Sequence, residues 1–175
     1  MLRAAEHEVL VEENEGGRLG ELYRRHAPDA GRLAYLLTGD RALAEDVVQE
    51  AFVRMFGRFR DLRHAEAFHA YLRRTVVNLV YSHFRRKRVE RAYLQREGRE
   101  PEVVLPDTAD RQVLWGALKE LSARQRAAIV LRYYEDLSEA QTAEVLGCPV
   151  GTVKSLTSRG ITRLREELAR SEQDG

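Results

Sequence analysis

Residues 138–168 read SEAQTAEVLGCPVGTVKSLTSRGITRLREEL, and this stretch decides the fold of the last third of the chain. Ser138 followed by Gln141 forms a capping box, in which the two side chains satisfy each other's backbone donors at the start of a helix. Apolar residues recur at helical spacing up to Gly147, a residue type that ends helices in the left-handed conformation. The stretch therefore predicts a short helix, a glycine turn and a second helix from about Gly151.

The second predicted helix has two chemically different faces. Its apolar positions fall on one side, namely Val153, Leu156, Gly160, Leu164 and Leu168. The other side is cationic and rich in hydroxyls, with Thr152 beside Lys154, Ser155, Ser158, Arg159 and Thr162. No acidic residue occurs from 151 to 165. Such a pair of helices is typical of a DNA-binding helix-turn-helix, and a helical hairpin with a solvated basic face is the alternative that the pattern leaves open.

The composition indicates a helical protein whose charges are segregated along the chain. Of the 175 residues, 33% are charged and only 7% are aromatic, and the net charge is +1. Residues 1–21 hold six Glu and two Arg, whereas residues 82–100 hold seven basic residues and three Glu. An acidic start, a basic middle and a basic final helix indicate surfaces that meet different partners.

Several classes of site are not expected. The single cysteine, Cys148, excludes an internal disulfide and fits a reducing compartment. No apolar run approaches the length of a membrane span, so we expect a cytoplasmic protein without membrane insertion. The five histidines have no ligand spacing that pairs with Cys148, and no phosphate-binding glycine loop occurs. We therefore expect no metal, no cofactor and no catalytic residues, and an enzyme is the least favoured class.

An N-terminal helical domain is predicted over 18–88. It follows an acidic arm at 1–17, which we expect to be frayed or weakly helical. Pro28 interrupts the first apolar pattern and predicts a kink or two abutting helices there. Gly39 is expected to end this element.

A helix predicted from Arg41 to about Phe56 carries an acidic ridge. Asp40 is a suitable N-cap for it. Its buried side is expected at Val48, Ala51, Phe52 and Met55, and its outer side at Glu45, Asp46, Gln49 and Glu50. These acids suit the N-terminal half of a helix and solubility, and a partner-binding ridge is the other interpretation.

A long helix predicted from about Glu66 to Arg88 mixes basic and aromatic side chains. Its buried stripe is expected at Phe68, Leu72, Val76, Leu79 and Phe84. Its exposed residues include Tyr71, Arg73, Arg74, Asn78, Arg85, Arg86 and Arg88. This mixture suits nucleic acid, because cations hold the backbone while rings stack on bases. A charged helix end favoured by the helix dipole is an equally good interpretation.

Residues 89–107 are polar and hold two of the four prolines, so they predict a flexible linker. A second helical domain is predicted over 108–170, with one helix ending near Leu121 and another opened by a capping box of Ser122 and Gln125. No strand pattern occurs. The prediction is therefore an all-α fold of two small helical domains joined by a flexible linker, the C-terminal one a helix-turn-helix.

Three blocks of this sequence resemble one known family. DRALAEDVVQEAFVRMF, AFHAYLRRTVVNLVYSHFRRKR and LSARQRAAIVLRYYEDLSEAQTAEVLGCPVGTVKS are similar to the extracytoplasmic-function (ECF) sigma factors of the sigma-70 family. The likeness runs from about Leu19 to Leu168, in the family's order and spacing. It implies a dissociable subunit that binds core RNA polymerase and directs it to promoter DNA.

The resemblance also implies roles for individual residues. Asp46, Val47, Gln49 and Glu50 would contact the clamp helices of the polymerase large subunit, and the flap would be a second contact. The domain at 18–88 would bind the minus-ten element through Tyr71, Arg73, Arg74, Asn78, Arg85, Arg86 and Arg88. The domain at 108–170 would read the minus-thirty-five element through Thr152, Lys154, Ser155, Ser158 and Arg159. An anti-sigma protein is a further expected partner.

Some positions depart from the family's pattern. Tyr71 stands where Trp is frequent, Ser82 where Asp is frequent, and Leu156 where Arg or Gln is frequent. Pro149 stands where a serine usually caps the recognition helix, so Cys148 is expected to take the cap and Pro149 the first helical position. A stand-alone helix-turn-helix regulator, acting without polymerase, is the alternative function.

Overall fold

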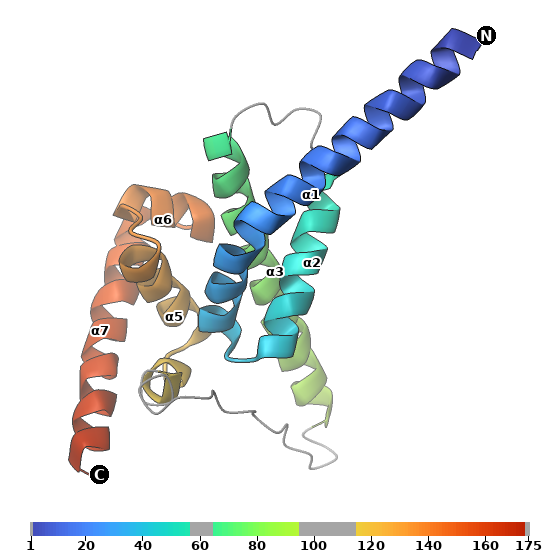
Figure 1. Ribbon diagram of the computed structural model, residues 1–175. Helices are drawn as coiled ribbons and strands as arrows, with labels where there is room; N and C mark the ends of the chain where they lie inside the picture. Colours follow the sequence, from blue (N-terminus) through green and yellow to red (C-terminus); the bar gives the residue numbers. More distant parts are fainter. Residues whose placement is uncertain (1, 57–64, 95–114, 174–175) are drawn as a thin grey trace.

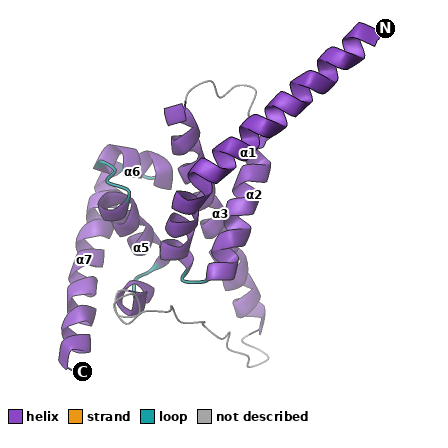
Figure 2. Cartoon of the chain, viewed as in Figure 1, coloured by secondary structure: helices purple, strands orange, loops and turns teal. Residues whose placement is uncertain are grey.

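The computed structural model describes residues 2–56, 65–94 and 115–173 (Figure 1). Its described residues are helical and contain no strand (Figure 2), which confirms the predicted all-α class. The elements are α1 (Leu2–Thr38), α2 (Arg41–Phe56), α3 (Ala65–Leu94), α5 (Ala123–Ile129), the π-helix η2 (Val130–Tyr134), α6 (Glu139–Leu146) and α7 (Val150–Gln173). We call α1–α3 the N-terminal unit and residues 115–173 the C-terminal unit.

Helix α1 begins earlier than expected and is continuous through Pro28. Residues 2–17 belong to the same helix as the rest of α1, and its first turns project beyond the other elements (Figure 1). The helix also runs through Pro28 and is not divided into two. A proline removes one backbone hydrogen bond, but Ala30, Leu33 and Leu37 of the following turns are buried in the core. Tertiary packing of this apolar stripe stabilises the helix beyond the proline.

Helix α2 has the predicted bounds and the predicted start. Gly39 adopts a positive φ of 71°, and the Asp40 side chain accepts a hydrogen bond of 3.0 Å from the backbone N–H of Leu43. The expected inner residues Val48, Ala51, Phe52 and Met55 are all buried. The acidic side of α2 therefore faces outward.

Helix α3 is longer than expected. It continues to Leu94, so 89–94 of the predicted linker are helical, and the rest of that linker lies outside the described residues. Phe68, Leu72, Val76 and Leu79 are buried as predicted, whereas Phe84 is only half-buried. Val77 and Val80 are buried as well, which gives α3 a wider apolar stripe than the spacing alone indicated.

Local capping shapes the C-terminal unit. Both capping boxes form, with Gln125 N–H donating to Ser122 Oγ at 3.3 Å and Gln141 N–H donating to Ser138 Oγ at 3.2 Å. Gly147 ends α6 in the left-handed conformation at φ 60° and ψ 43°, as predicted. The helix expected to run through Tyr133 divides instead into α5 and the wider turn η2.

One apolar core joins the two units. Buried residues of α1, α2 and α3 share a continuous cluster with residues of α5, η2, α6 and α7, among them Leu131, Leu146 and Val153. A second cluster around Trp115 and Ile129 includes Leu36 of α1. Figure 1 shows α5 and α6 between the N-terminal unit and α7, which lies at the outer edge. The two units are thus in direct contact.

Trp115 and Arg126 form much of this contact. A Cβ added at Gly39 would overlap the Trp115 ring, so the indole lies directly on the turn between α1 and α2. The Arg126 guanidinium lies 4.9 Å from the centre of that ring and is 8% exposed. It donates to the main-chain oxygens of Leu118, Lys119 and Leu121 in its own unit and, at 2.9 Å, to that of Leu37 in α1. Burial lowers the pKa of Arg126 to about 10, which still leaves it charged at neutral pH.

Close packing of α5 against α7 depends on Gly160. A Cβ at this buried position would lie 2.7 Å from Ile129 Cδ1. Replacing Gly160 with leucine is expected to lower the free energy of unfolding by about 1–3 kcal/mol, because the two helices must separate to admit the side chain. Urea denaturation followed by circular dichroism measures the change. Gly151→Ala is the matched control, since nothing lies within 4 Å of its Cβ; an equal loss in both variants would contradict the close-packing account.

Candidate nucleic-acid interface

The second helix of the helix-turn-helix, α7, begins at Val150, between the start at about Gly151 that its pattern predicted and the start at Pro149 that the family comparison implied. The carbonyl oxygen of Pro149 accepts hydrogen bonds from the N–H groups of Thr152 at 2.9 Å and Val153 at 3.3 Å. Pro149 therefore occupies the N-cap position, and the prediction that Cys148 caps a helix starting at Pro149 was wrong by one residue. Because proline has no polar side chain, the first turn of α7 leaves its N–H groups directed at the surroundings.

The residues predicted to read the minus-thirty-five element lie on the outer face of α7. Lys154, Ser155, Ser158 and Arg159 are exposed, and Thr152 is half-buried. Lys154 Nζ lies 3.6 Å from Glu139 Oε2 of α6, and Ser155 Oγ donates to Gly151 O at 3.0 Å. Val153 and Gly160 on the opposite side are buried. The predicted division of this helix into an apolar back and a polar front is confirmed.

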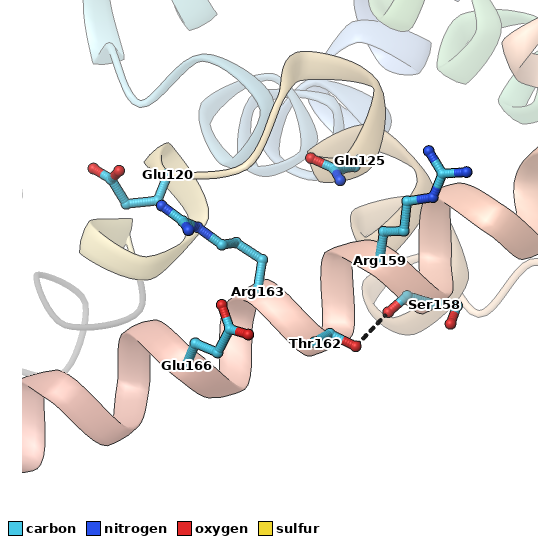
Figure 3. Close-up of a pocket in the computed structure, with 7 residues that line it drawn as sticks. All are labelled: Glu120, Gln125, Ser158, Arg159, Thr162, Arg163 and Glu166. Atoms are coloured by element: carbon cyan, nitrogen blue, oxygen red, sulfur yellow. Dashed lines mark hydrogen bonds between the residues drawn. The ribbon is translucent and has the colours of Figure 1, made fainter.

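An open groove of about 370 Å³ runs beside this face (Figure 3). Its lining comes from the start of α5 and from the middle of α7, namely Glu120, Gln125, Ser158, Arg159, Thr162, Arg163 and Glu166. Thr162 Oγ1 donates to Ser158 O at 3.1 Å, and Arg163 pairs with Glu167 at 3.0 Å. The Arg159 side chain extends past Gln125 in Figure 3. Arg159 is thus a cation at the groove's edge with its guanidinium in solvent.

Helix α3 presents part of the predicted minus-ten surface. Tyr71, Arg74, Asn78 and Arg85 follow one another at spacings that keep them on one side of a helix. Arg74, Asn78 and Arg85 are exposed, and Tyr71 is half-buried. Arg86 is also exposed, while the side chain of Arg88 lies outside the described residues.

Arg73 departs from this pattern because it faces the C-terminal unit. Its Nε donates to Glu135 Oε2 at 2.6 Å, and the two side chains are only 13% and 11% exposed. A second N–H of its guanidinium donates to His69 Nδ1 at 3.1 Å. Glu135 follows η2 in the chain, and nothing in its local sequence marked it as a partner for α3. In this arrangement Arg73 is not open to DNA.

Tyr81, about two turns further along α3 than Arg73, is also covered. Its hydroxyl is buried and has no hydrogen-bond partner among the described residues. Burial raises the pKa of Tyr81 to about 12, with Arg124 and Cys148 of the C-terminal unit as its nearest electrostatic neighbours. The C-terminal unit therefore packs over one edge of α3 and leaves the edge with Asn78 exposed.

The acidic ridge of α2 is exposed with one exception. Asp46, Gln49 and Glu50 are exposed, but Val47 is 3% exposed and belongs to the core, so it does not lie on this surface. Sequence reasoning missed Val53, which is 73% exposed and follows Glu50 by three residues on the same side. An apolar residue among acids at helical spacing was the available signal.

Among the described residues, no group of three or more His, Cys, Asp or Glu side chains is placed to hold a metal ion. Within the same ranges, no helix has the length and apolar character needed to cross a membrane.

Comparisons with known proteins identify two sigma-70 regions in this chain. Residues 22–90 match the family Sigma-70 region 2, and residues 111–164 match Sigma-70, region 4. The chain is 36% identical over 159 residues to the RNA polymerase sigma-E factor of Streptomyces coelicolor, covering 88% of each protein. It is 35% identical to the ECF RNA polymerase sigma factor SigL of Mycobacterium tuberculosis, covering 86% of this chain and 89% of the relative.

A solved structure has the same fold. The sigma factor RpoE of Bartonella quintana, in complex with the anti-sigma factor NepR, superimposes with a TM-score of 0.72 at 28% identity. The match covers 86% of this chain and 96% of that one. With both sigma-70 regions in order on one all-helical chain, and relatives that align over most of their length, the protein belongs to the ECF sigma factors of the sigma-70 family.

Proposed function

We propose that this sigma factor binds core RNA polymerase and directs it to promoters by reading both promoter elements. The observation that carries the proposal is the presence of three separate polar faces on one small chain: an acidic face on α2, a mixed basic and polar face on α3, and a cationic face on α7. A stand-alone regulator needs only the helix-turn-helix. The acidic face, with exposed Val53 at its C-terminal end, would then have no role.

The N-terminal domain, residues 18–88, is proposed to bind polymerase and the minus-ten element. Asp46, Gln49 and Glu50 of α2 would contact the clamp helices of the large subunit, with Val53 as an added apolar contact. On α3, Asn78 would contact an extruded base, Tyr71 would stack beside it, and Arg73, Arg74, Arg85, Arg86 and Arg88 would hold phosphates. Extruding a base costs a few kcal/mol, so phosphate contacts on both sides are needed to offset it.

The C-terminal domain, residues 108–170, is proposed to read the minus-thirty-five element in the major groove. Thr152, Lys154, Ser155, Ser158 and Arg159 would face the DNA, since the second helix of a helix-turn-helix enters that groove. The polymerase flap would be a second contact of this domain. Residues 95–107, the part of the predicted linker that follows α3, would let the two domains reach their elements, and no role is assigned to the arm at 1–17.

An anti-sigma protein is the proposed regulatory partner. The support is the Bartonella quintana relative, whose structure contains the anti-sigma factor NepR. The same fold here, with both units in contact, is compatible with such a complex.

Transcription in vitro tests the proposal. Purified core polymerase is incubated with fragments of the source genome, with and without the protein, and the start sites are mapped. Start sites that occur only with the protein would support the proposal and give both promoter elements. If no transcript forms but the protein alone protects DNA from cleavage, the stand-alone regulator becomes the better account.

Arg159 is the residue of α7 whose loss we expect to weaken promoter reading. Arg159→Ala is expected to reduce affinity for the minus-thirty-five element by about 1–3 kcal/mol, because an arginine that bonds a base edge contributes about that much discrimination. Arg165→Ala removes the same charge nearly two turns further along α7, beyond the residues proposed to read the element, and is the control. Binding is measured on the mapped element and on a scrambled one; an equal loss on both sequences would demote Arg159 to a phosphate contact.

A further inference from the structure

The contact between the two units places carboxylates against the arginines of α3. Glu135 bonds Arg73 at 2.6 Å, and both side chains are almost covered. In the same direction, Glu144 Oε1 of α6 lies 4.0 Å from Arg74 NH1. A carboxylate presents oxygens to a guanidinium much as a phosphate does. Glu135 therefore occupies a group that, under the proposed function, binds a DNA phosphate, whereas Glu144 and Arg74 form a looser and exposed pair.

Three further contacts hold the units in this arrangement. Arg126 reaches Leu37 O at 2.9 Å, Trp115 lies on Gly39, and Arg32 of α1 donates to the Tyr134 hydroxyl at 3.1 Å. None of them involves the exposed faces of α2 or α7. The contact thus covers one edge of α3 and leaves the polymerase-facing ridge and the cationic face of α7 in solvent.

The length of a promoter is incompatible with this closed arrangement. Elements centred at minus ten and minus thirty-five are about 25 base pairs apart, or about 85 Å of duplex at about 3.4 Å per base pair. A compact body of about 150 residues has a radius of gyration of about 15 Å, so its diameter is on the order of 40 Å. The two units must separate before α3 and α7 can reach both elements.

We propose that the free protein is closed by its own C-terminal unit, with Glu135 as an internal competitor that holds Arg73 in place of a DNA phosphate. This proposal rests on the proposed function, since it concerns the same α3 surface. Separation of the units releases Arg73 and Tyr81 together, because both lie under the C-terminal unit. DNA binding by α3 and opening of the molecule are therefore coupled.

The first test measures opening without DNA, in the full-length protein. Cys148 is the chain's single cysteine, it is half-buried, and it packs against the joint core near Tyr81. Glu135→Gln leaves Arg73 covered but without its carboxylate, which destabilises the closed form. The variant is therefore expected to raise the rate at which a thiol reagent modifies Cys148 by about tenfold. Asp136→Asn removes the same charge one residue away and is the control. Asparagine tolerates the positive φ of 50° at this position.

Swapping the charges of Glu135 and Arg73 distinguishes loss of their ion pair from a general loss of folded structure. Glu135→Arg and Arg73→Glu are each expected to increase Cys148 modification, and the double variant is expected to restore protection. Circular dichroism confirms that each variant remains helical. If the double variant is as reactive as the single ones, or if Glu135→Gln behaves like Asp136→Asn, the ion pair does not hold the closed form.

The second test measures DNA binding without polymerase. A fluorescein-labelled, single-stranded 20-nucleotide DNA of mixed sequence is titrated and followed by anisotropy. Glu135→Gln is expected to bind several-fold tighter than both the wild type and Asp136→Asn, because only it frees Arg73. Equal affinities of Glu135→Gln and Asp136→Asn would overturn the competitor role. The proposed function fails separately if no polymerase-dependent start sites form. In that case Cys148 protection can still depend on Glu135, so the two failures are distinguishable.

Discussion

Replacement of both Asp46 and Glu50 by lysine is expected to abolish association with core RNA polymerase while leaving the fold intact. Both side chains are exposed on the outer side of α2, so the change reaches no buried group. Carboxylates on this ridge suit a cationic surface of the polymerase, so lysines in their place would bring like charges together across the interface, which costs several kcal/mol. The expected effect is a loss of binding that added salt partly relieves.

The two substitutions are expected to lower the free energy of unfolding only slightly. Glu50 pairs with Arg54 at 2.6 Å on the helix surface, and a repulsive pair at this spacing destabilises a helix by about 0.2–0.5 kcal/mol. Association is measured by co-elution with purified core polymerase. A variant with lysine at Glu120 and Glu166 carries the same charge change on the C-terminal unit and is expected to keep binding. Co-elution of the Asp46 and Glu50 variant at wild-type levels would remove the ridge from the proposed function.

Arg126→Leu is expected to lower the free energy of unfolding by about 3–5 kcal/mol, because it strips donors from buried oxygens and cannot replace them. Arg126 donates to the main-chain oxygens of Leu37, Leu118, Lys119 and Leu121, and it lies over the Trp115 ring. Each acceptor left without a partner in a buried site costs about 1–3 kcal/mol, less where water enters. The variant is also expected to loosen the contact between the units, since Leu37 belongs to α1.

Two measurements follow the Arg126 variants. Urea denaturation by circular dichroism gives the change in stability, and fluorescence of Trp115, the chain's single tryptophan, reports on the contact with Gly39. Arg126→Lys keeps the positive charge but lacks the planar fork, so it is expected to recover only part of the loss. A loss below about 1 kcal/mol for Arg126→Leu would show that water or neighbouring groups satisfy the four oxygens.

Much of the fold could be predicted from the sequence because its signals are local. The two capping boxes, the N-cap at Asp40 and the left-handed Gly147 each depend on residues within four positions of one another. The two faces of α7 follow from its period in the same way. At Pro28, where two abutting helices were one of the two alternatives, packing of the turns beyond the proline keeps α1 a single helix.

The candidate site was only partly predictable, because local signals do not indicate which side chains packing will bury or pair. Helical spacing placed Asp46, Asn78 and Arg159 on exposed faces, whereas the resemblance assigned Val47 to a surface from which burial excludes it. The resemblance also assigned Arg73 to DNA, because nothing in the sequence indicated that Glu135 pairs with it. The resemblance to sigma factors named the roles of these faces, and it contained no information on how the two units lie against each other.

The sequence by itself determined that this chain is all-helical, that it ends in a helix-turn-helix, and that it belongs with the sigma factors. Only the tertiary structure decided that the two units share a core. The Arg73–Glu135 pair joins residues 62 positions apart, and the bond from Arg126 to Leu37 spans 89 positions. No periodic pattern encodes such pairs, because they form only when packing of separate helices brings the two side chains together and excludes the water between them.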